Sequence, residues 1–309
     1  MTANEIAQAP CVLFAYQEMG YECMRVLLEL GAPIKAVFTH ADDPHEEIWW
    51  NSCAELARTN SIPVFTAESR DPKLPNRIAA IAPSIIYSFY YRHLLSQSIL
   101  KCAPRGAFNL HGSLLPAYRG RAPVNWVLVN GESKTGVTLH HMVARADAGD
   151  IVAQREVPID DCDTALSLYR KLIPVGADLI RQMHPRIAAG TAPRRKQDIE
   201  QGSYYGRRRP EDGRIDWNWP ARRVFNLVRA VTHPYPGAFC VADGRKLMVW
   251  SAAISSELGN HAAPGTIIRP SLDSTEVACG SGSLRLLRVE FERDGEGAAS
   301  DILTGIGRL

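Results

Sequence analysis

Residues 11–16 read CVLFAY and residues 33–40 read PIKAVFTH. Both runs are short and apolar, with β-branched and aromatic side chains, and this predicts two buried strands. Between them, Tyr21–Leu30 carries apolar side chains at helical spacing. A strand, a helix and a second strand within about thirty residues form a βαβ unit, and such units build parallel sheets with right-handed crossovers. The N-terminal part of the chain is therefore predicted to be an α/β unit.

The alternation of strands and helices continues downstream. A long helical pattern covers Asp163–Ala189, where Pro174 and Pro185 should bend or end the helix, because proline removes a backbone hydrogen bond. The other predicted helices are Glu46–Thr59, one that ends at Ile78–Ile81, and Ala122–Val129, and the predicted strands are Ile62–Phe65, Ser84–Tyr91, Ala107–Leu110, Gly136–Met142 and Ile151–Val157.

The composition changes at Ala192–Arg209, which is rich in Arg, Pro and Gly and is interpreted as a linker between domains. A length of 309 residues agrees with two domains. We expect residues 1–202 to form the first and residues 203–309 a smaller β-rich second. The second should hold a helix at Ala221–Ala230, a hairpin turn at 242–244 and strands at Gly237–Val241, Lys246–Ala252, Gly265–Ile268, Glu276–Cys279 and Leu284–Glu292.

Composition excludes several classes of protein. Lys plus Arg number 35 and Asp plus Glu 33, so the formal net charge of +2 gives no broad basic surface for nucleic acid. No apolar run approaches the length of a membrane span. The N-terminal MTANEIAQAP lacks the pattern of a secretory signal, which favours a cytoplasmic location. The seven scattered cysteines form no C-x-x-C pair, which disfavours a metal site and agrees with the same location. The first βα turn, at 16–20, lacks G-x-G-x-x-G, which disfavours NAD.

The residues most suited to chemistry lie around 109–150. Asn109 and His111 are two apart on a predicted strand, so their side chains share one face at the ligand-binding end of a parallel sheet. An Asn amide can stabilise an oxyanion, and a His can move a proton near neutral pH. A carboxylate should orient His111, and both Asp147 and Asp150 are candidates. Ser113 lacks the G-x-S-x-G context of a hydrolase nucleophile.

Three motifs in this region identify a family. They are N-L-H-G-S-L-L-P at 109–116, R-G-R-A-P at 119–123 and D-A-G at 147–149. Their order and separation resemble the folate-dependent formyltransferases. Longer stretches, such as RGRAPVNWVLVNGESKTGVT at 119–138 and PYPGAF at 234–239, resemble more narrowly the formyltransferase half of the bifunctional aminoarabinose enzymes of lipid A modification. The likeness extends over essentially the whole chain.

The resemblance implies a Rossmann-like formyltransferase domain followed by a smaller open-barrel-like (OB-like) β domain. It implies formyl transfer from 10-formyltetrahydrofolate to the 4-amino group of UDP-4-amino-4-deoxy-L-arabinose, a step of lipid A modification and polymyxin resistance, with no metal, membrane or protein partner. Asn109 would stabilise the oxyanion, His111 would transfer the proton and Asp147 would support His111. The folate contacts would be His93, Leu94, Leu95, Arg121, Val143, Ala144, Arg145, Ala146 and Asp147.

Other acceptors remain open. Methionyl-tRNA formyltransferases have the same catalytic motif, but they commonly show W-R-G-A-A-P-I-Q where this chain has Y-R-G-R-A-P-V-N at 118–125. A dTDP-linked aminosugar is a further alternative acceptor. A third hypothesis is that the protein is a degenerate formyltransferase with a binding role and no enzymatic activity. The resembled enzymes continue into an NAD-dependent decarboxylating domain, so the chain is either a free-standing formyltransferase or one domain of a longer enzyme.

Overall fold

A computed structural model describes residues 9–42, 44, 47–66, 71–255, 262–270, 273–292 and 294–309. The N-terminal segment 1–8 and Glu46, the expected start of a helix, lie outside these residues. Residues 47–52, expected in the same helix, are described and are not helical, so this part of the prediction is wrong. The described chain forms two compact units. The first unit contains the residues up to 120 together with 134–158 and 170–205, and the second contains 121–133, 159–169 and 206–309. The expected domain boundary between residues 202 and 203 stays a prediction.

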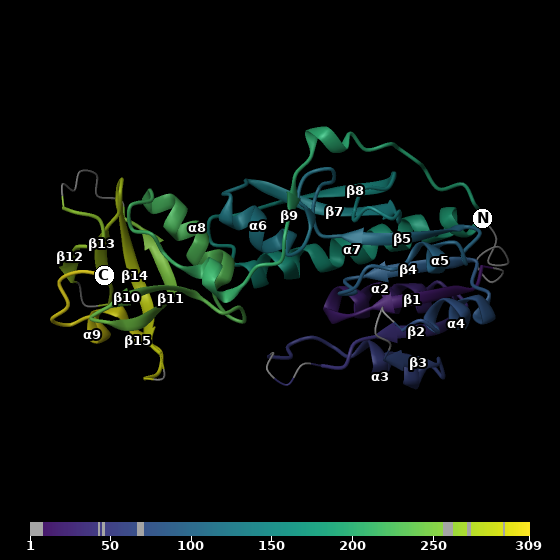
Figure 1. Ribbon diagram of the computed structural model, residues 1–309, viewed down its shortest axis with the longest axis horizontal. Coiled ribbons are helices and arrows are strands. Elements are labelled where there is room, and N and C mark those ends of the chain that lie inside the picture. Colours follow the sequence, from purple (N-terminus) through teal and green to yellow (C-terminus); the bar gives the residue numbers. More distant parts are fainter. Residues whose placement is uncertain are drawn as a thin grey trace. The chain divides into compact units, whose positions relative to one another are not determined.

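The first unit is built on one sheet with the strand order β3-β2-β1-β4-β5-β7-β8 (Figure 1). The strands from β3 to β5 pair in parallel, whereas β7 and β8 pair antiparallel at one edge. This parallel-dominated sheet confirms the predicted α/β fold. The strands are β1 (Cys11–Ala15), β2 (Ile34–Thr39), β3 (Val64–Thr66), β4 (Ile85–Phe89), β5 (Gly106–His111), β7 (Lys134–His141) and β8 (Ile151–Pro158).

The central strands are buried on both faces, which explains why their sequences are continuously apolar rather than alternating. All five residues of β1 and all five of β4 are buried. The helices of this unit bury apolar stripes; in α2, for example, Met19, Met24 and Leu27 are buried. They are α2 (Gln17–Glu29), α3 (Cys53–Thr59), α4 (Leu74–Ile81), α5 (Gln97–Leu100) and the larger part of α7 (Ala165–Ala188).

Helix α7 contains Pro174 and Pro185, yet it runs through both without ending. Of the two expected outcomes, the end of the helix at a proline is wrong, and a bend stays a prediction. Proline costs about 3 kcal/mol in a helix interior, and burial of Leu172, Leu179 and other apolar residues offsets this cost. The helix also packs closely at Gly176, where a Cβ would lie 2.6 Å from the Met19 sulfur.

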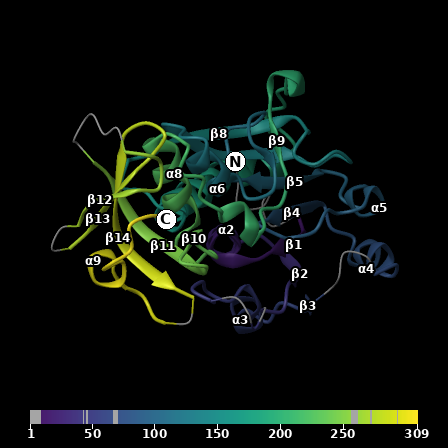
Figure 2. The same ribbon diagram turned by 60° about the vertical axis from the view of Figure 1, so that its left-hand side comes forward.

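The second unit contains a curled antiparallel sheet with the order β10-β11-β14-β13-β12 and β15 beside β14 (Figure 2). Asp243 and Gly244 have φ of +49° and +73° and join β10 to β11 in the expected hairpin. The elements are α6 (Pro123–Val129), the start of α7, η2 (Pro210–Gly213), α8 (Ala221–Val231), β10 (Ala238–Ala242), β11 (Arg245–Ile254), β12 (Ile267–Pro270), β13 (Thr275–Ala278), β14 (Ser283–Phe291), β15 (Gly297–Ala298) and α9 (Ala299–Ile302).

A small element in the first unit has no counterpart among the predicted strands. β6 (Arg119–Gly120) pairs in parallel with β9 (Tyr204–Tyr205). The one-turn helix η1 (Ile199–Gln201) precedes β9, and both lie inside the segment interpreted from its composition as a linker. This segment is therefore ordered against the first unit as far as residue 205.

Candidate active site

Asn109 and His111 lie at the carboxyl end of β5, on the same face of the strand, as their spacing predicts. The neighbouring strand β7 runs antiparallel, and its register places His140 opposite Asn109 and Thr138 opposite His111. β5 is thus bordered by the parallel strand β4 on one side and by β7 on the other. The site forms where the parallel part of the sheet ends.

The hydrogen bond of His111 decides which of its ring nitrogens carries the proton. The side chain is only 6% exposed, and Nε2 lies 2.7 Å from the carbonyl oxygen of Tyr118. A carbonyl can only accept, so Nε2 is protonated and donates. In the neutral imidazole, Nδ1 is then the bare nitrogen, and it lies 3.7 Å from Oδ2 of Asp147. His111 therefore presents a basic nitrogen beside a carboxylate.

Asp147 lies in the loop between β7 and β8 and faces both residues of the strand. Its Oδ2 accepts a hydrogen bond from the Gly120 N–H at 2.9 Å, and its Oδ1 accepts one from Asn109 Nδ2 at 3.3 Å. Asp147 has φ of +52°, and Tyr118 has φ of +59°. Such a conformation costs about 1–3 kcal/mol per residue and persists only where the surroundings hold it. Two residues of the site therefore have strained backbones.

The protonation of Asp147 follows from these neighbours. Burial by itself raises the pKa of the Asp147 carboxyl. The charges that His111 and His140 carry when protonated, a hydrogen bond from protonated His140, and the Gly120 N–H act in the opposite direction. Together they hold the pKa of Asp147 well below its usual range, so the carboxylate is ionised at neutral pH.

His140 is a member of the site that the sequence did not reveal. It is 2% exposed, and its Nε2 lies 3.1 Å from Asn109 Nδ2 and 3.4 Å from Asp147 Oδ1. Its Nδ1 donates to the carbonyl of His141 at 2.8 Å, so neutral His140 accepts from Asn109 through Nε2. The signal that could have found His140 is the antiparallel register of β5 and β7, which depends on the fold.

The alternatives that the sequence left open separate clearly. The carboxylate of Asp150 pairs with Nε of Arg194 at 2.6 Å, so Asp147 is the carboxylate that meets Asn109 and His111. The Ser113 hydroxyl is buried and donates to the carbonyl of Ala117 at 2.7 Å. Ser113 is therefore engaged in the structure of its loop.

The residues expected to contact folate fall into two loops and one separate position. His93 and Leu94 are exposed after β4, with Leu94 67% exposed, whereas Leu95 is 6% exposed and belongs to an apolar core cluster. A ligand could therefore meet Leu95 only through its backbone. Arg121 is the first residue of the second unit. In the loop before Asp147, the first three residues are exposed and the fourth is half-buried: Val143, Ala144, Arg145 and Ala146.

The described residues also show whether the protein has a metal site or a membrane-spanning helix. Among the described residues, no cluster of His, Cys, Asp and Glu is arranged to hold a metal ion. No helix in the described part of the chain is long and apolar enough to cross a membrane.

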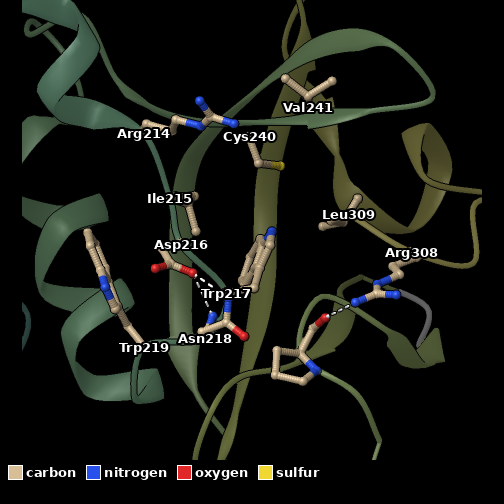
Figure 3. A pocket seen from close by; sticks show the side chains of 11 residues that line it. Arg214, Ile215, Asp216, Trp217, Asn218, Trp219, Cys240, Val241, Arg308 and Leu309 are labelled. Atoms are coloured by element: carbon tan, nitrogen blue, oxygen red, sulfur yellow. Dashed lines mark hydrogen bonds between the residues drawn. The ribbon is translucent and has the colours of Figure 1, made fainter.

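A separate cavity of about 560 Å³ lies within the second unit (Figure 3). Trp217 lies in its middle, and Arg214 and Arg308 lie on opposite sides. Asp216 accepts hydrogen bonds from the backbone and side-chain nitrogens of Asn218 at 3.0 and 2.8 Å. None of the residues expected in the catalytic or folate site lines this cavity.

Comparison with known families defines the class of protein. Residues 29–182 match the family described as formyl transferase, and residues 208–307 match the formyl transferase C-terminal domain. The two matches follow one another along the chain and together cover most of it. The chain therefore belongs to the formyl transferase family.

Solved structures show the same fold at low sequence identity. The N-formyltransferase from Helicobacter canadensis, in complex with folinic acid and dTDP-3-aminofucose, is 19% identical with a TM-score of 0.73 over 90% of this chain and 98% of that one. A sugar N-formyltransferase from Shewanella sp FDAARGOS_354 is 18% identical with a TM-score of 0.64, over 82% and 100%. A variant of HypX from Aquifex aeolicus is 16% identical with a TM-score of 0.66, over 97% and 49%, so this chain spans about half the length of HypX.

Proposed function

We propose that the protein transfers a formyl group from 10-formyltetrahydrofolate to the amino group of a nucleotide-linked sugar. The observation that carries this proposal is the convergence of Asn109, His111 and Asp147 in a chain of the formyl transferase family. An amide donor, a bare imidazole nitrogen and an ionised carboxylate are the groups that acyl transfer to an amine requires.

Asn109 is the residue that stabilises negative charge on the formyl oxygen. Its Nδ2 carries two hydrogens, which point to His140 at 3.1 Å and to Asp147 at 3.3 Å. We expect the substrate oxygen to take one of these two hydrogens, while the other keeps the amide in orientation. A single donor of this kind contributes about 3 kcal/mol to the transition state.

His111 moves the proton that the amine loses when it attacks the formyl carbon. The bare Nδ1 accepts this proton, because the Tyr118 carbonyl fixes the existing hydrogen on Nε2. The resulting imidazolium lies beside the Asp147 carboxylate at 3.7 Å, which stabilises the positive charge. The imidazolium then gives its proton to the donor nitrogen as the bond between that nitrogen and the formyl carbon breaks, so that tetrahydrofolate leaves as a neutral amine. Asp147 keeps its own charge throughout, because its pKa lies well below the working pH.

The loops around the site offer apolar surface and backbone hydrogen-bonding groups to a donor with a flat ring. The formyl-folate supplies the one-carbon group when it is bound. Leu94 and Val143 are apolar residues that are 67% and 44% exposed, so a ligand can reach them. Exposed loop backbone beside them offers donors and acceptors for the edges of a pterin ring. The complex of the Helicobacter canadensis enzyme with folinic acid supports a folate donor.

For the acceptor we propose UDP-4-amino-4-deoxy-L-arabinose, in lipid A modification. The sequence R-G-R-A-P-V-N at 119–125 and the stretches that resemble the aminoarabinose enzymes support this choice. The near-neutral charge of the chain disfavours tRNA, which needs a broad basic surface. A dTDP-linked aminosugar is the alternative within the same class, since the Helicobacter canadensis enzyme was solved with one.

The test is incubation with 10-formyltetrahydrofolate and each acceptor in turn, followed by mass spectrometry of the product. The acceptors are the UDP-aminopentose, a dTDP-amino hexose and Met-tRNA, with Asn109→Ala as the inactive control. Formylation of the UDP sugar is expected. Product with the dTDP sugar alone would change the nucleotide, and product with Met-tRNA alone would overturn the sugar proposal. No product with any acceptor would indicate a binding protein.

A further inference from the structure

Residues 195–205, here called the strap, lie along the outer side of the candidate site. The sequence of this segment suggests only a basic linker. In the structure it begins with a bridge between Arg195 and Ile151 and ends in β9, which pairs with β6. Between these two anchors it hydrogen-bonds to the backbone of both loops that position the catalytic side chains.

The first set of contacts joins the strap to residues 116–119, which lead into β6. Arg119 N–H donates to the Ser203 carbonyl at 3.0 Å, and Tyr118 N–H donates to the Ser203 hydroxyl at 2.8 Å. Ser203 N–H donates in turn to the Pro116 carbonyl at 3.2 Å. The ring of Tyr205 stacks on that of Tyr118 at 5.0 Å. One residue of the strap, Ser203, thus bonds to three positions of this segment: Pro116, Tyr118 and Arg119.

The opposite edge of the same short segment faces the catalytic groups. The Tyr118 carbonyl accepts from His111 Nε2, and the Gly120 N–H donates to Asp147 Oδ2. Residues 118–120 therefore have one edge bonded to the strap and the other bonded to His111 and Asp147. A displacement of the strap would move both hydrogen bonds together.

The second set of contacts holds the Asp147 loop directly. The side-chain amide of Gln197 donates to the carbonyl of Asp147 at 3.0 Å and also to the carbonyl of Gly149. The first carbonyl belongs to the residue whose φ is +52°, and the second lies two residues further along the same loop. A strained conformation needs neighbours that over-determine it, and Gln197 supplies two hydrogen bonds for that purpose.

We propose that Gln197 and Ser203 are positioning residues for formyl transfer, acting through Asp147 and through the Tyr118 carbonyl that fixes His111. This inference rests on the proposed function. Gln197 holds the backbone of the Asp147 loop, and Ser203 holds the backbone that bonds to His111. Neither side chain touches the reacting groups, so both should affect turnover more than substrate binding.

The central experiment is a double-mutant cycle on kcat with Gln197→Met and Asp147→Asn. Met approximates the volume of Gln and lacks its donors. We expect Gln197→Met to lower kcat about tenfold with the KM of both substrates within about twofold, because misplacement of a catalytic group costs turnover. In the Asp147→Asn background the same change should cost less than about twofold, since the loop then has no carboxylate to position. Equal effects in both backgrounds would overturn the proposal for Gln197.

Rescue and control variants separate positioning from general damage. Gln197→Lys restores a donor at the same place and should recover most of the lost kcat. Glu200→Gln changes an exposed residue of the same strap and should leave kcat and KM unchanged. Ser203→Ala should also lower kcat, as Gln197→Met does. A loss of kcat that Gln197→Lys does not restore would contradict the role assigned to the amide donor.

A readout without turnover keeps this inference distinguishable from the proposed function. Because the Gly120 N–H donates to Asp147, we expect this amide to be protected from hydrogen exchange, and NMR can follow it in the intact chain. We expect faster exchange in Gln197→Met and normal protection in Gln197→Lys. If the wild-type protein formylates no acceptor but the protection behaves in this way, the proposed function fails and the positioning contact stands. Unchanged protection in Gln197→Met would overturn the contact itself.

Discussion

The end of strand β5 and the strap both contact the same loop. They differ in the chemical groups involved, which are side chains in the first case and mostly backbone groups of the loop in the second. Asn109 and His111 act through side chains, and their spacing on a strand is visible in the sequence. The strap holds the same loop mostly by bonding to carbonyls and N–H groups of other segments. Backbone groups are the same in every residue, so such support leaves no motif. This difference explains why one region was predicted to be catalytic and the other a linker.

The largest expected effect tests the side-chain half of this comparison. Asn109→Ala removes the donor for the formyl oxygen and should lower kcat roughly 100-fold. Steady-state turnover with the formyl donor and the aminosugar measures it. Turnover near the wild-type rate would remove Asn109 from this role and would leave the backbone contacts as the stronger evidence for the site.

A smaller effect tests the backbone half. A Cβ at Gly202 would lie 2.2 Å from the Pro116 carbonyl oxygen, so Gly202→Ala must push the strap away from the loop it supports. We expect kcat to fall about tenfold. Gly206→Ala is the matched control, because a Cβ there meets nothing within 4 Å. Equal kcat for the two variants would show that the strap tolerates displacement.

A third effect concerns the loop expected to contact the donor. Leu94→Ala removes exposed apolar surface that the free protein does not need, so its free energy of unfolding should stay the same. Loss of about 1 kcal/mol of apolar contact should raise the KM for the formyl donor about fivefold, with the KM for the aminosugar unchanged. Equal increases in both KM values would place Leu94 outside the donor site.

The smallest expected effect concerns the charge of Asp147 and the way in which the free energy of unfolding depends on pH. The pKa of Asp147 is lower in the folded than in the unfolded chain, so its carboxylate stabilises the fold above about pH 4 and this contribution is lost as the pH falls further. The difference in the free energy of unfolding between wild type and Asp147→Asn should therefore shrink between pH 5 and pH 3, as measured by urea denaturation.

Leu94→Ala serves as a control for that measurement, because it removes no polar or charged group. Its difference from wild type should not change with pH over the same range. A difference for Asp147→Asn that stays constant down to pH 3 would contradict the low pKa of Asp147.

The comparison of Asp147 with Asp150 shows where prediction from the sequence stops. Both carboxylates lie in one short loop, and the residue types left both as candidates, although the family resemblance favoured Asp147. The structure separates them because the backbone at Asp147 has φ of +52° and its side chain reaches the Gly120 N–H, whereas Asp150 reaches Arg194. Side-chain direction in a loop depends on such dihedral angles, and these are set by contacts with distant segments.

The sequence by itself determined the α/β class, most of the strands, and the pairing of Asn109 with His111 on one face. These features follow from local periodicity, because side chains alternate along a strand and recur along a helix whatever surrounds them. Only the tertiary structure brought His140 opposite Asn109, placed Asp147 beside Asn109 and His111 while Asp150 pairs with Arg194, and turned the expected linker into the strap. Those outcomes depend on register and on backbone hydrogen bonds between segments far apart in the chain, for which no residue type is required.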